Sequence, residues 1–175
     1  MQALYTNIAG HGRPLVLLHG WGMNSQVWQP IHAALTQNYR VITVDLPGHG
    51  RSHHLHLGSL DEVVEQLRPH IPSHAVIMGW SLGGQLATLL VQQLEYQFSD
   101  QKILISLASN PCFVAQSAWK FGMPEQTFIQ FKQSFQQDAV ATLKRFGFLV
   151  CQGTDSAKKD FIQMQKQIKP QPISL

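Results

Sequence analysis

Ala75-Val76-Ile77-Met78-Gly79-Trp80-Ser81-Leu82-Gly83 joins an apolar run, typical of a buried strand, to a GxSxG motif. Leucines follow at positions 82, 86, 89, 90 and 94, so a long helix is predicted directly after the motif. A serine hydroxyl is a weak nucleophile and must be presented on a tight turn with small neighbours, which Gly79 and Gly83 provide. The strand, turn and helix together predict that Ser81 is a catalytic nucleophile.

Two backbone amides are expected to stabilise negative charge beside this serine. The first is the N–H of Leu82, at the start of the predicted helix. The second is predicted in the loop that follows an early strand, His19-Gly20-Trp21-Gly22, where the Trp21 amide takes this role. We interpret His19 as a brace of this loop and not as a proton carrier. The side chains of Trp21 and Trp80 either flank a substrate or simply pack under a helical insertion that is predicted later in the chain.

Short apolar segments alternate with helical patterns over the first two thirds of the chain. The predicted strands are Leu4–Ile8, Leu15–His19, Arg40–Asp45, Ala75–Met78 and Ile103–Ala108. Several of them lack polar alternation, which is typical of a mostly parallel sheet covered by helices on both faces. One covering helix is predicted to begin at Ser59, where Glu62 completes a capping box. The predicted fold class is α/β.

After Pro111 no further convincing strand is predicted, and helical periodicity takes over. Phenylalanines at positions 128, 131 and 135 share one helix face, either as packing or as the lining of an acyl-chain tunnel. Aspartates are predicted to cap two further helices, over residues 138–148 and 155–168. We expect residues 1–112 to form the N-terminal part of the sheet domain and residues 113–175 to form a helical lid insertion.

Composition and charge limit the classes of function. The chain is 44% hydrophobic and 13% charged, and no apolar run approaches the roughly 20 residues of a membrane span, so we expect a cytoplasmic globular protein without a membrane segment. Residues 113–175 hold eight Lys or Arg against four Asp or Glu, which is either an ordinary solvated surface or a docking face for an acidic partner. No nucleic-acid motif accompanies these lysines, so nucleic acid is not an expected partner.

Neither a metal nor an organic cofactor is predicted. Cys112 and Cys151 lack the spacing of a zinc site or a disulfide framework. The histidines at positions 53, 54 and 56 form a local cluster that contains no cysteine or carboxylate and are interpreted as a solvated loop. The segment Asp45–Ser52 lacks the Lys-Ser/Thr ending of a phosphate-binding loop.

Three segments, LVLLHGWG, DLPGHGRS and GWSLGG, resemble the α/β-hydrolase superfamily. The segment Ala108–Phe113 and the helical region with Arg145-Phe146 resemble one branch, the pimeloyl-[acyl-carrier protein] methyl ester esterases of biotin synthesis. This resemblance implies hydrolysis of the methyl ester of pimeloyl-acyl carrier protein through an acyl-serine, without metal or cofactor.

The resemblance also implies roles for individual residues. Trp21, Ser81 and Leu82 would contact the acyl group, and part of the lid would line its pocket, namely Phe146, Gly147, Phe148, Leu149 and Val150. Arg145 and Lys158 would dock the acidic carrier protein, although Ala141 and Ile162 stand where further basic residues are expected.

The acid and the base of the catalytic triad are not found. In this fold the order along the chain is Ser, then Asp or Glu, then His. All nine histidines precede Ser81, and the later acidic residues fall in predicted helix or lid segments. We therefore expect a C-terminally truncated chain that lacks the strands bearing the acid and the base. Such a chain would be a poor or inactive esterase, and its exposed sheet edge would promote self-association.

Two other functions stay open at this point. A general short-chain carboxylesterase or thioesterase would use the same nucleophile and oxyanion donors. Comparing hydrolysis of a carrier-bound methyl ester with that of a free short-chain ester distinguishes it from a pimeloyl methyl ester esterase. A non-catalytic binding protein would keep the framework and use the basic lid, which the missing histidine favours. Labelling by a serine-directed fluorophosphonate probe separates this second alternative from an enzyme.

Overall fold

The computed structural model describes residues 3–95, 103–153 and 155–167. The described residues divide into two compact units, one formed by residues up to Ser109 and the other beginning at Asn110. The first unit holds the sheet and the GxSxG motif, and the second holds the later helices.

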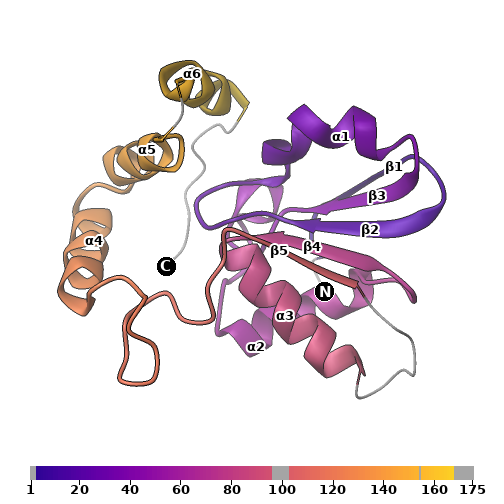
Figure 1. Ribbon diagram of the computed structural model, residues 1–175, viewed down its shortest axis with the longest axis horizontal. Coiled ribbons are helices and arrows are strands. Elements are labelled where there is room, and N and C mark those ends of the chain that lie inside the picture. The colour runs from indigo at the N-terminus through magenta and orange to yellow at the C-terminus, as the bar shows by residue number, and fades with distance from the viewer. Residues whose placement is uncertain (1–2, 96–102, 154, 168–175) are drawn as a thin grey trace. The chain divides into compact units, whose positions relative to one another are not determined.

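The described part of the first unit contains a five-stranded sheet in the order β1-β3-β2-β4-β5. Its strands are β1 (Thr6–Ala9), β2 (Arg13–Leu18), β3 (Tyr39–Val44), β4 (Val76–Trp80) and β5 (Ile103–Leu107). Only β1 runs antiparallel to its neighbour, while the β3-β2-β4-β5 pairs are all parallel (Figure 1). The predicted α/β fold with a mostly parallel sheet is confirmed, and the strand bounds differ from the prediction by one or two residues.

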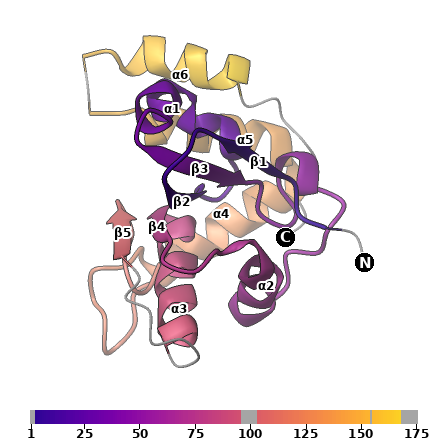
Figure 2. The same ribbon diagram turned by 90° about the vertical axis from the view of Figure 1, so that its right-hand side faces the viewer.

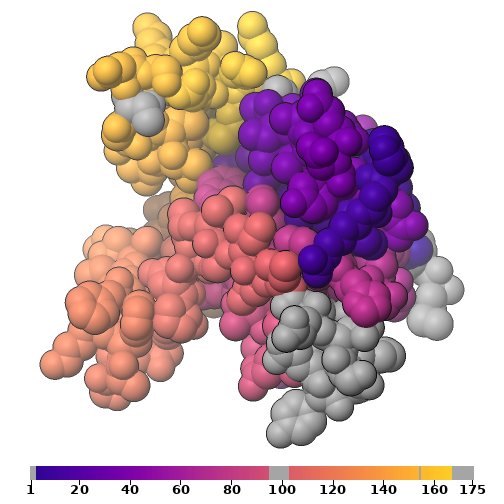
Figure 3. All heavy atoms as spheres, turned by 45° about the vertical axis from the view of Figure 1, so that its right-hand side comes forward, coloured from indigo at the N-terminus to yellow at the C-terminus, as the bar shows by residue number. Residues whose placement is uncertain are grey.

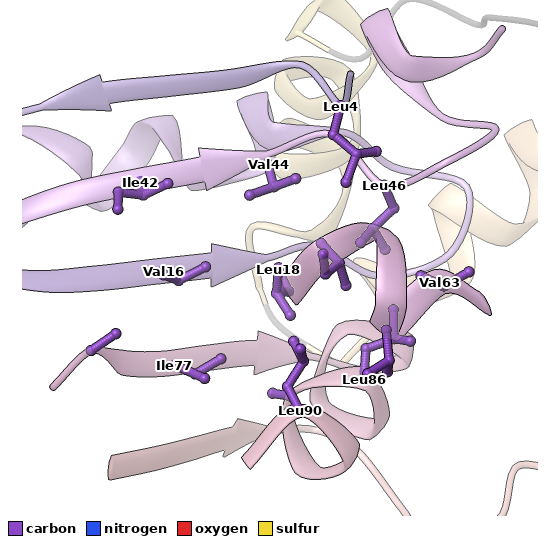
Figure 4. Close-up of a cluster of buried hydrophobic side chains, with 14 of the residues drawn as sticks. Leu4, Val16, Leu18, Ile42, Val44, Leu46, Val63, Ile77, Leu86 and Leu90 are labelled. Atoms are coloured by element: carbon purple, nitrogen blue, oxygen red, sulfur yellow. The ribbon is translucent and has the colours of Figure 1, made fainter. Parts of the chain in front are cut away.

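Helices cover both faces of the sheet, which explains the uninterrupted apolar strands (Figure 2). One face packs against η1 (Ser25–Trp28) and α1 (Gln29–Leu35), through buried residues such as Leu15, Leu17 and Trp28. The other packs against α2 (Leu60–Leu67) and α3 (Leu82–Glu95), through residues such as Val16, Ile77 and Leu86 (Figure 4). Successive residues of β2 therefore enter opposite halves of the core, because side chains alternate across a strand.

The sequence marks the start of α2 clearly but does not mark the start of α1. α2 begins where predicted, with Ser59 as its N-cap and Glu62 completing the capping box. α1 was not anticipated from the sequence, because it has seven residues, no buried residue and no clear apolar period. The η1 turn that leads into α1 is capped by Asn24, whose side chain accepts a hydrogen bond from Gln26 N. α1 itself has a proline in its first turn.

The second unit consists of three consecutive helices, α4 (Glu125–Gln137), α5 (Ala139–Val150) and α6 (Ala157–Gln167) (Figure 1). Asp138 caps α5 as predicted, accepting a hydrogen bond from Ala141 N at 2.9 Å. Asp155 was predicted as the cap of α6, but this is wrong by one position, since α6 begins at Ala157 and Ser156 directly precedes it. The predicted end of this helix at residue 168 lies outside the described residues.

The two outer strands of the sheet are short. β1 has four residues, and the indigo atoms of the early described residues are seen at the surface (Figure 3). β5 has five residues, and its Ile103 and Leu107 are both exposed. Among the described residues, the outer edge of β5 pairs with no further strand.

Candidate active site

The turn between β4 and α3 holds Ser81 in a left-handed backbone conformation, with φ of +55°. Residues other than glycine rarely adopt this conformation, and it is strained for a side chain with a Cβ atom. The core fixes both sides of the turn, because β4 is paired on both edges and α3 packs on the sheet. The sharp reversal at Ser81 is what the GxSxG motif predicts for an exposed nucleophile, and the residue is half-buried.

Close backbone approach explains the two glycines of the motif. A Cβ atom at Gly79 would collide with the Gly83 carbonyl oxygen, and one at Gly83 would collide with the Leu18 carbonyl oxygen at the end of β2. Both positions face backbone atoms, which cannot move aside as a flexible side chain can. Glycine at these positions therefore allows the start of α3 to lie directly against the ends of β4 and β2.

Main-chain hydrogen bonds fix the Ser81 peptide units. Ser81 N donates to the Leu107 carbonyl at 3.0 Å, extending the β4-β5 ladder beyond the last paired residues. The Ser81 carbonyl accepts from Gly84 N at 2.9 Å and from Gln85 N at 3.3 Å, which starts the first turn of α3. Leu82 is the first residue of this helix, so its N–H lacks an acceptor within the helix.

The His19–Gly22 loop lies directly beside this turn. A Cβ atom at Gly20 would stand 3.3 Å from Ser81 Cβ and 3.1 Å from Cε3 of the Trp80 ring. The structure thus brings the Ser81 turn together with the loop that carries Trp21, as the sequence predicted for two parts of one site. Trp21 and Trp80 are both half-buried.

His19 is buried beneath this loop, and both of its ring nitrogens are engaged. Nδ1 donates to the Gly20 carbonyl at 2.8 Å, and Nε2 accepts from Leu46 N at 2.9 Å. Burial, together with the nearby His49, lowers the pKa of His19 to about 3. The neutral ring uses both nitrogens to connect the loop after β2 with the loop after β3. His19 therefore stabilises these loops structurally.

Asp45 links the same loops by its carboxylate. Oδ1 accepts from Ser25 N at 2.7 Å, and Oδ2 accepts from Arg51 N at 2.9 Å. Gly50 has a φ of +50°, and a Cβ atom there would collide with the Asp45 carboxylate. The segment that superficially resembles a phosphate loop is therefore closed around its own buried carboxylate, which two backbone N–H groups stabilise.

The predicted pocket residues of the lid lie on different sides of α5. Phe146 packs against Phe131 of α4, with ring centroids 6.0 Å apart. Gly147 is buried, and a Cβ atom there would stand 2.8 Å from Met164 Cε of α6. Phe148 and Leu149 are exposed, and Val150 is half-buried. Within the second unit, Phe146 and Gly147 thus contribute to helix packing. The Phe148 ring also packs against Phe161 of α6, with ring centroids 5.5 Å apart, and its remaining surface is exposed beside Leu149.

The predicted docking residues Arg145 and Lys158 are exposed on α5 and α6. They lie within a unit that is rich in lysine, beside other exposed cations such as Lys144 and Lys159. Their exposure leaves their charges available to a partner.

The described residues also bear on metal, thiol and membrane sites. They contain no group of three or more His, Cys, Asp or Glu side chains that could hold a metal ion. Within the same ranges, Cys112 and Cys151 are free thiols. No helix in the part of the chain that the structure describes is long and apolar enough to cross a membrane.

One residue at this site was missed by sequence reasoning. Ser109, two residues beyond the end of β5, donates from its hydroxyl to the Ser81 carbonyl at 2.8 Å. A serine that follows a strand carries no signal of such a contact, because the partner lies 28 positions away in the chain.

Comparison with known proteins agrees with this geometry. The sequence matches the alpha/beta hydrolase family over residues 15–166, and the chain belongs to this family. The resemblance predicted from the motifs is therefore confirmed. An esterase from Exiguobacterium antarcticum has a similar fold, with a TM-score of 0.76 at 20% identity over 94% of this chain and 63% of that one.

Curated relatives narrow the comparison to one branch. The chain is 39% identical to the pimeloyl-[acyl-carrier protein] methyl ester esterase of Vibrio vulnificus, over 97% of this chain and 66% of the relative. It is 36% identical to the protein of the same name from Nitrosomonas europaea, over 100% of this chain and 70% of that relative. The chain thus spans about two thirds of the length of the curated relatives it matches.

The buried histidine pair predicts that stability falls in mild acid. Burial lowers the pKa of both His19 and His49, so the folded chain keeps them neutral while the unfolded chain takes up protons below pH 6.5. Their contribution is complete above pH 6.5 and is lost as the pH falls towards the folded pKa values. For His19, this amounts to about 2 kcal/mol between pH 6.5 and pH 5.

Urea unfolding measured at several pH values between 5 and 7.5 tests this expectation. His49→Phe removes one of the two titrating groups while keeping an aromatic ring, so the free energy of unfolding should depend less steeply on pH. Equal slopes for the original chain and His49→Phe would show that His49 does not contribute to this dependence.

Proposed function

We propose that this chain carries the nucleophile and the oxyanion donors of a serine carboxylesterase. The observation that carries the proposal is Ser81 at a φ of +55°, half-buried, on the turn between a fully paired strand and a packed helix. Strain of this kind persists only where the surrounding structure enforces it, and it is concentrated at functional sites. The amides of Leu82 and Trp21 are the proposed oxyanion donors.

The proposed reaction has two steps. Ser81 Oγ attacks the ester carbonyl carbon, its proton passes to a general base, and negative charge develops on the carbonyl oxygen beside the two amides. Collapse of this intermediate expels the alcohol, which takes up a proton, and leaves an acyl-serine. Water then attacks the acyl carbon, releasing the carboxylic acid and regenerating Ser81. The base is not His19, because both of its ring nitrogens are already hydrogen-bonded.

The proposed substrate is a pimeloyl methyl ester carried on acyl carrier protein, with methanol as the first product. Support comes from the curated relatives, which bear the name of this activity and are 36–39% identical to the chain. In this proposal Trp21, Ser81 and Leu82 contact the acyl group. Within the second unit, Phe148 and Leu149 offer exposed apolar surface to a methylene chain. A cytoplasmic location is part of the proposal and fits the two free cysteines.

Ser81→Ala tests the nucleophile directly. A fluorophosphonate probe should label the 175-residue chain at one serine, and the substitution should abolish labelling, because phosphonylation requires this hydroxyl. Hydrolysis of p-nitrophenyl butyrate should be slow, since no histidine follows Ser81 in the sequence, and should be lost in the same variant.

Peptide mapping of the labelled chain identifies the modified residue. Ser106→Ala is the matched control, because Ser106 is an exposed serine of β5 and its loss should leave labelling unchanged. Labelling that persists in Ser81→Ala would refute the assignment. No labelling of the unsubstituted chain would favour a non-catalytic binding protein.

The lid cations are proposed to dock the acidic carrier. Arg145→Glu combined with Lys158→Glu should weaken binding of acyl carrier protein to the chain about tenfold or more at low salt, and the difference should shrink as salt rises. Titration calorimetry measures this without requiring turnover. Lys120→Glu combined with Lys132→Glu supplies a control with the same change in net charge, because both side chains are exposed and neither has an assigned contact. Equal weakening by the control would mean that only net charge matters.

The exposed edge of β5 is proposed to mediate self-association. An unpaired edge with Ile103 and Leu107 exposed is a template for pairing with another strand. Light scattering after size-exclusion chromatography should show a concentration-dependent rise in mass. Ser106→Lys places a charge on this exposed strand and should shift the chain towards monomer, whereas a monomer at every concentration would contradict the proposal.

A further inference from the structure

The peptide that joins Ser81 to Leu82 is held from outside its own turn. The Ser109 hydroxyl donates to the Ser81 carbonyl at 2.8 Å, in a partly buried environment. That carbonyl also accepts from Gly84 N and Gln85 N. The Gly84 and Gln85 donors belong to α3 itself, whereas Ser109 connects the carbonyl to the segment that follows β5.

The end of β5 is shaped to make this contact. Ala108 has a φ of +42°, a left-handed conformation that is unfavourable for alanine. The residue before it, Leu107, accepts a hydrogen bond from Ser81 N at 3.0 Å, and the residue after it, Ser109, donates to the Ser81 carbonyl. Ala108 thus lies between Leu107, which binds the Ser81 N–H, and Ser109, which binds the Ser81 carbonyl.

Gly84 leaves room for the hydroxyl. A Cβ atom at Gly84 would stand 2.6 Å from Ser109 Cβ and 2.8 Å from Ser109 Oγ. Any larger residue at position 84 would displace Ser109 or the turn. Gly84 therefore allows Ser109 to lie close to the first turn of α3, whereas Gly83 allows the end of β2 to do so.

The contact bears on catalysis through the geometry of the peptide bond. The Ser81 carbonyl and the Leu82 N–H belong to one planar unit, so fixing the direction of the oxygen also fixes the direction of the N–H. A hydrogen bond to the carbonyl also polarises the peptide and strengthens its N–H as a donor.

We propose that Ser109 is a positioning residue that orients and polarises the Ser81–Leu82 peptide so that its N–H can receive the oxyanion. The inference rests on the proposed function, in which the Leu82 amide is an oxyanion donor. Ser109 does not touch the substrate, and its effect passes through the Ser81 carbonyl.

Four variants of the 175-residue chain test the proposal. Ser109→Ala removes the hydroxyl. Ser109→Thr and Ser109→Val form a matched pair of almost equal size, in which only threonine keeps the hydroxyl, so they decide the question if the alanine variant folds poorly. Ser106→Ala is a control for the loss of a serine from the neighbouring strand, where the side chain is exposed.

Two readouts are needed, one for the peptide and one for the reaction. Hydrogen exchange of the Gly84 and Gln85 amides reports how firmly the Ser81 carbonyl is held. The rate constant for fluorophosphonate labelling of Ser81 reports oxyanion stabilisation, because the probe develops the same negative charge.

Ser109→Ala and Ser109→Val should label about tenfold more slowly, a fraction of the 10²- to 10³-fold loss typical when an oxyanion donor is removed outright. Both variants should also exchange the Gly84 and Gln85 amides faster, while Ser109→Thr and Ser106→Ala should match the unsubstituted chain in both measurements.

Equal labelling rates for Ser109→Thr and Ser109→Val would overturn the inference. If the unsubstituted chain is not labelled at all, the proposed function fails, and the exchange rates then decide the positioning role alone. Faster exchange in Ser109→Val than in Ser109→Thr would support that role, and equal exchange would refute it.

Discussion

A single left-handed residue between a buried strand and a packed helix sets the geometry of this molecule. Ser81 reverses the chain so abruptly that α3 begins against the ends of β4 and β2, which only the glycines at 79 and 83 permit. The reversal is enforced by the hydrophobic core, because β4 and α3 each bury apolar side chains on the same side of the sheet. The energy that fixes the turn therefore comes from packing remote from the hydroxyl.

Buried polar groups stabilise the loops on the other side of this turn. His19 and Asp45 each join two loops through backbone N–H or carbonyl groups. The histidine can do this only in its neutral form, since protonation of Nε2 would turn the acceptor of the Leu46 N–H into a donor. Burial keeps it neutral by lowering its pKa. A scaffold that positions backbone amides thus depends on the uncharged state of a side chain that takes no part in the reaction.

The sequence predicted the elements whose chemistry is local. The apolar strands, the capping box at Ser59 and the strand-turn-helix around Ser81 could all be identified from neighbouring residues, and the structure agrees with them. Helix α1 was missed because it is short and buries no residue of its own. Ser109 was missed for a different reason: its role depends on the parallel pairing of β4 with β5, which brings together residues 28 positions apart. In the lid, helical periodicity indicated three helices but not which side of α5 each of residues 146–150 occupies.

Ser81 Oγ and the amides of Leu82 and Trp21 are proposed to form one site. A crystal structure of the chain after reaction with a phosphonate probe tests this arrangement. A covalent bond is expected at Ser81 Oγ, with a phosphonyl oxygen about 2.7–3.1 Å from both amide nitrogens. A phosphonyl oxygen that points away from these amides, or modification at another residue, would contradict this arrangement.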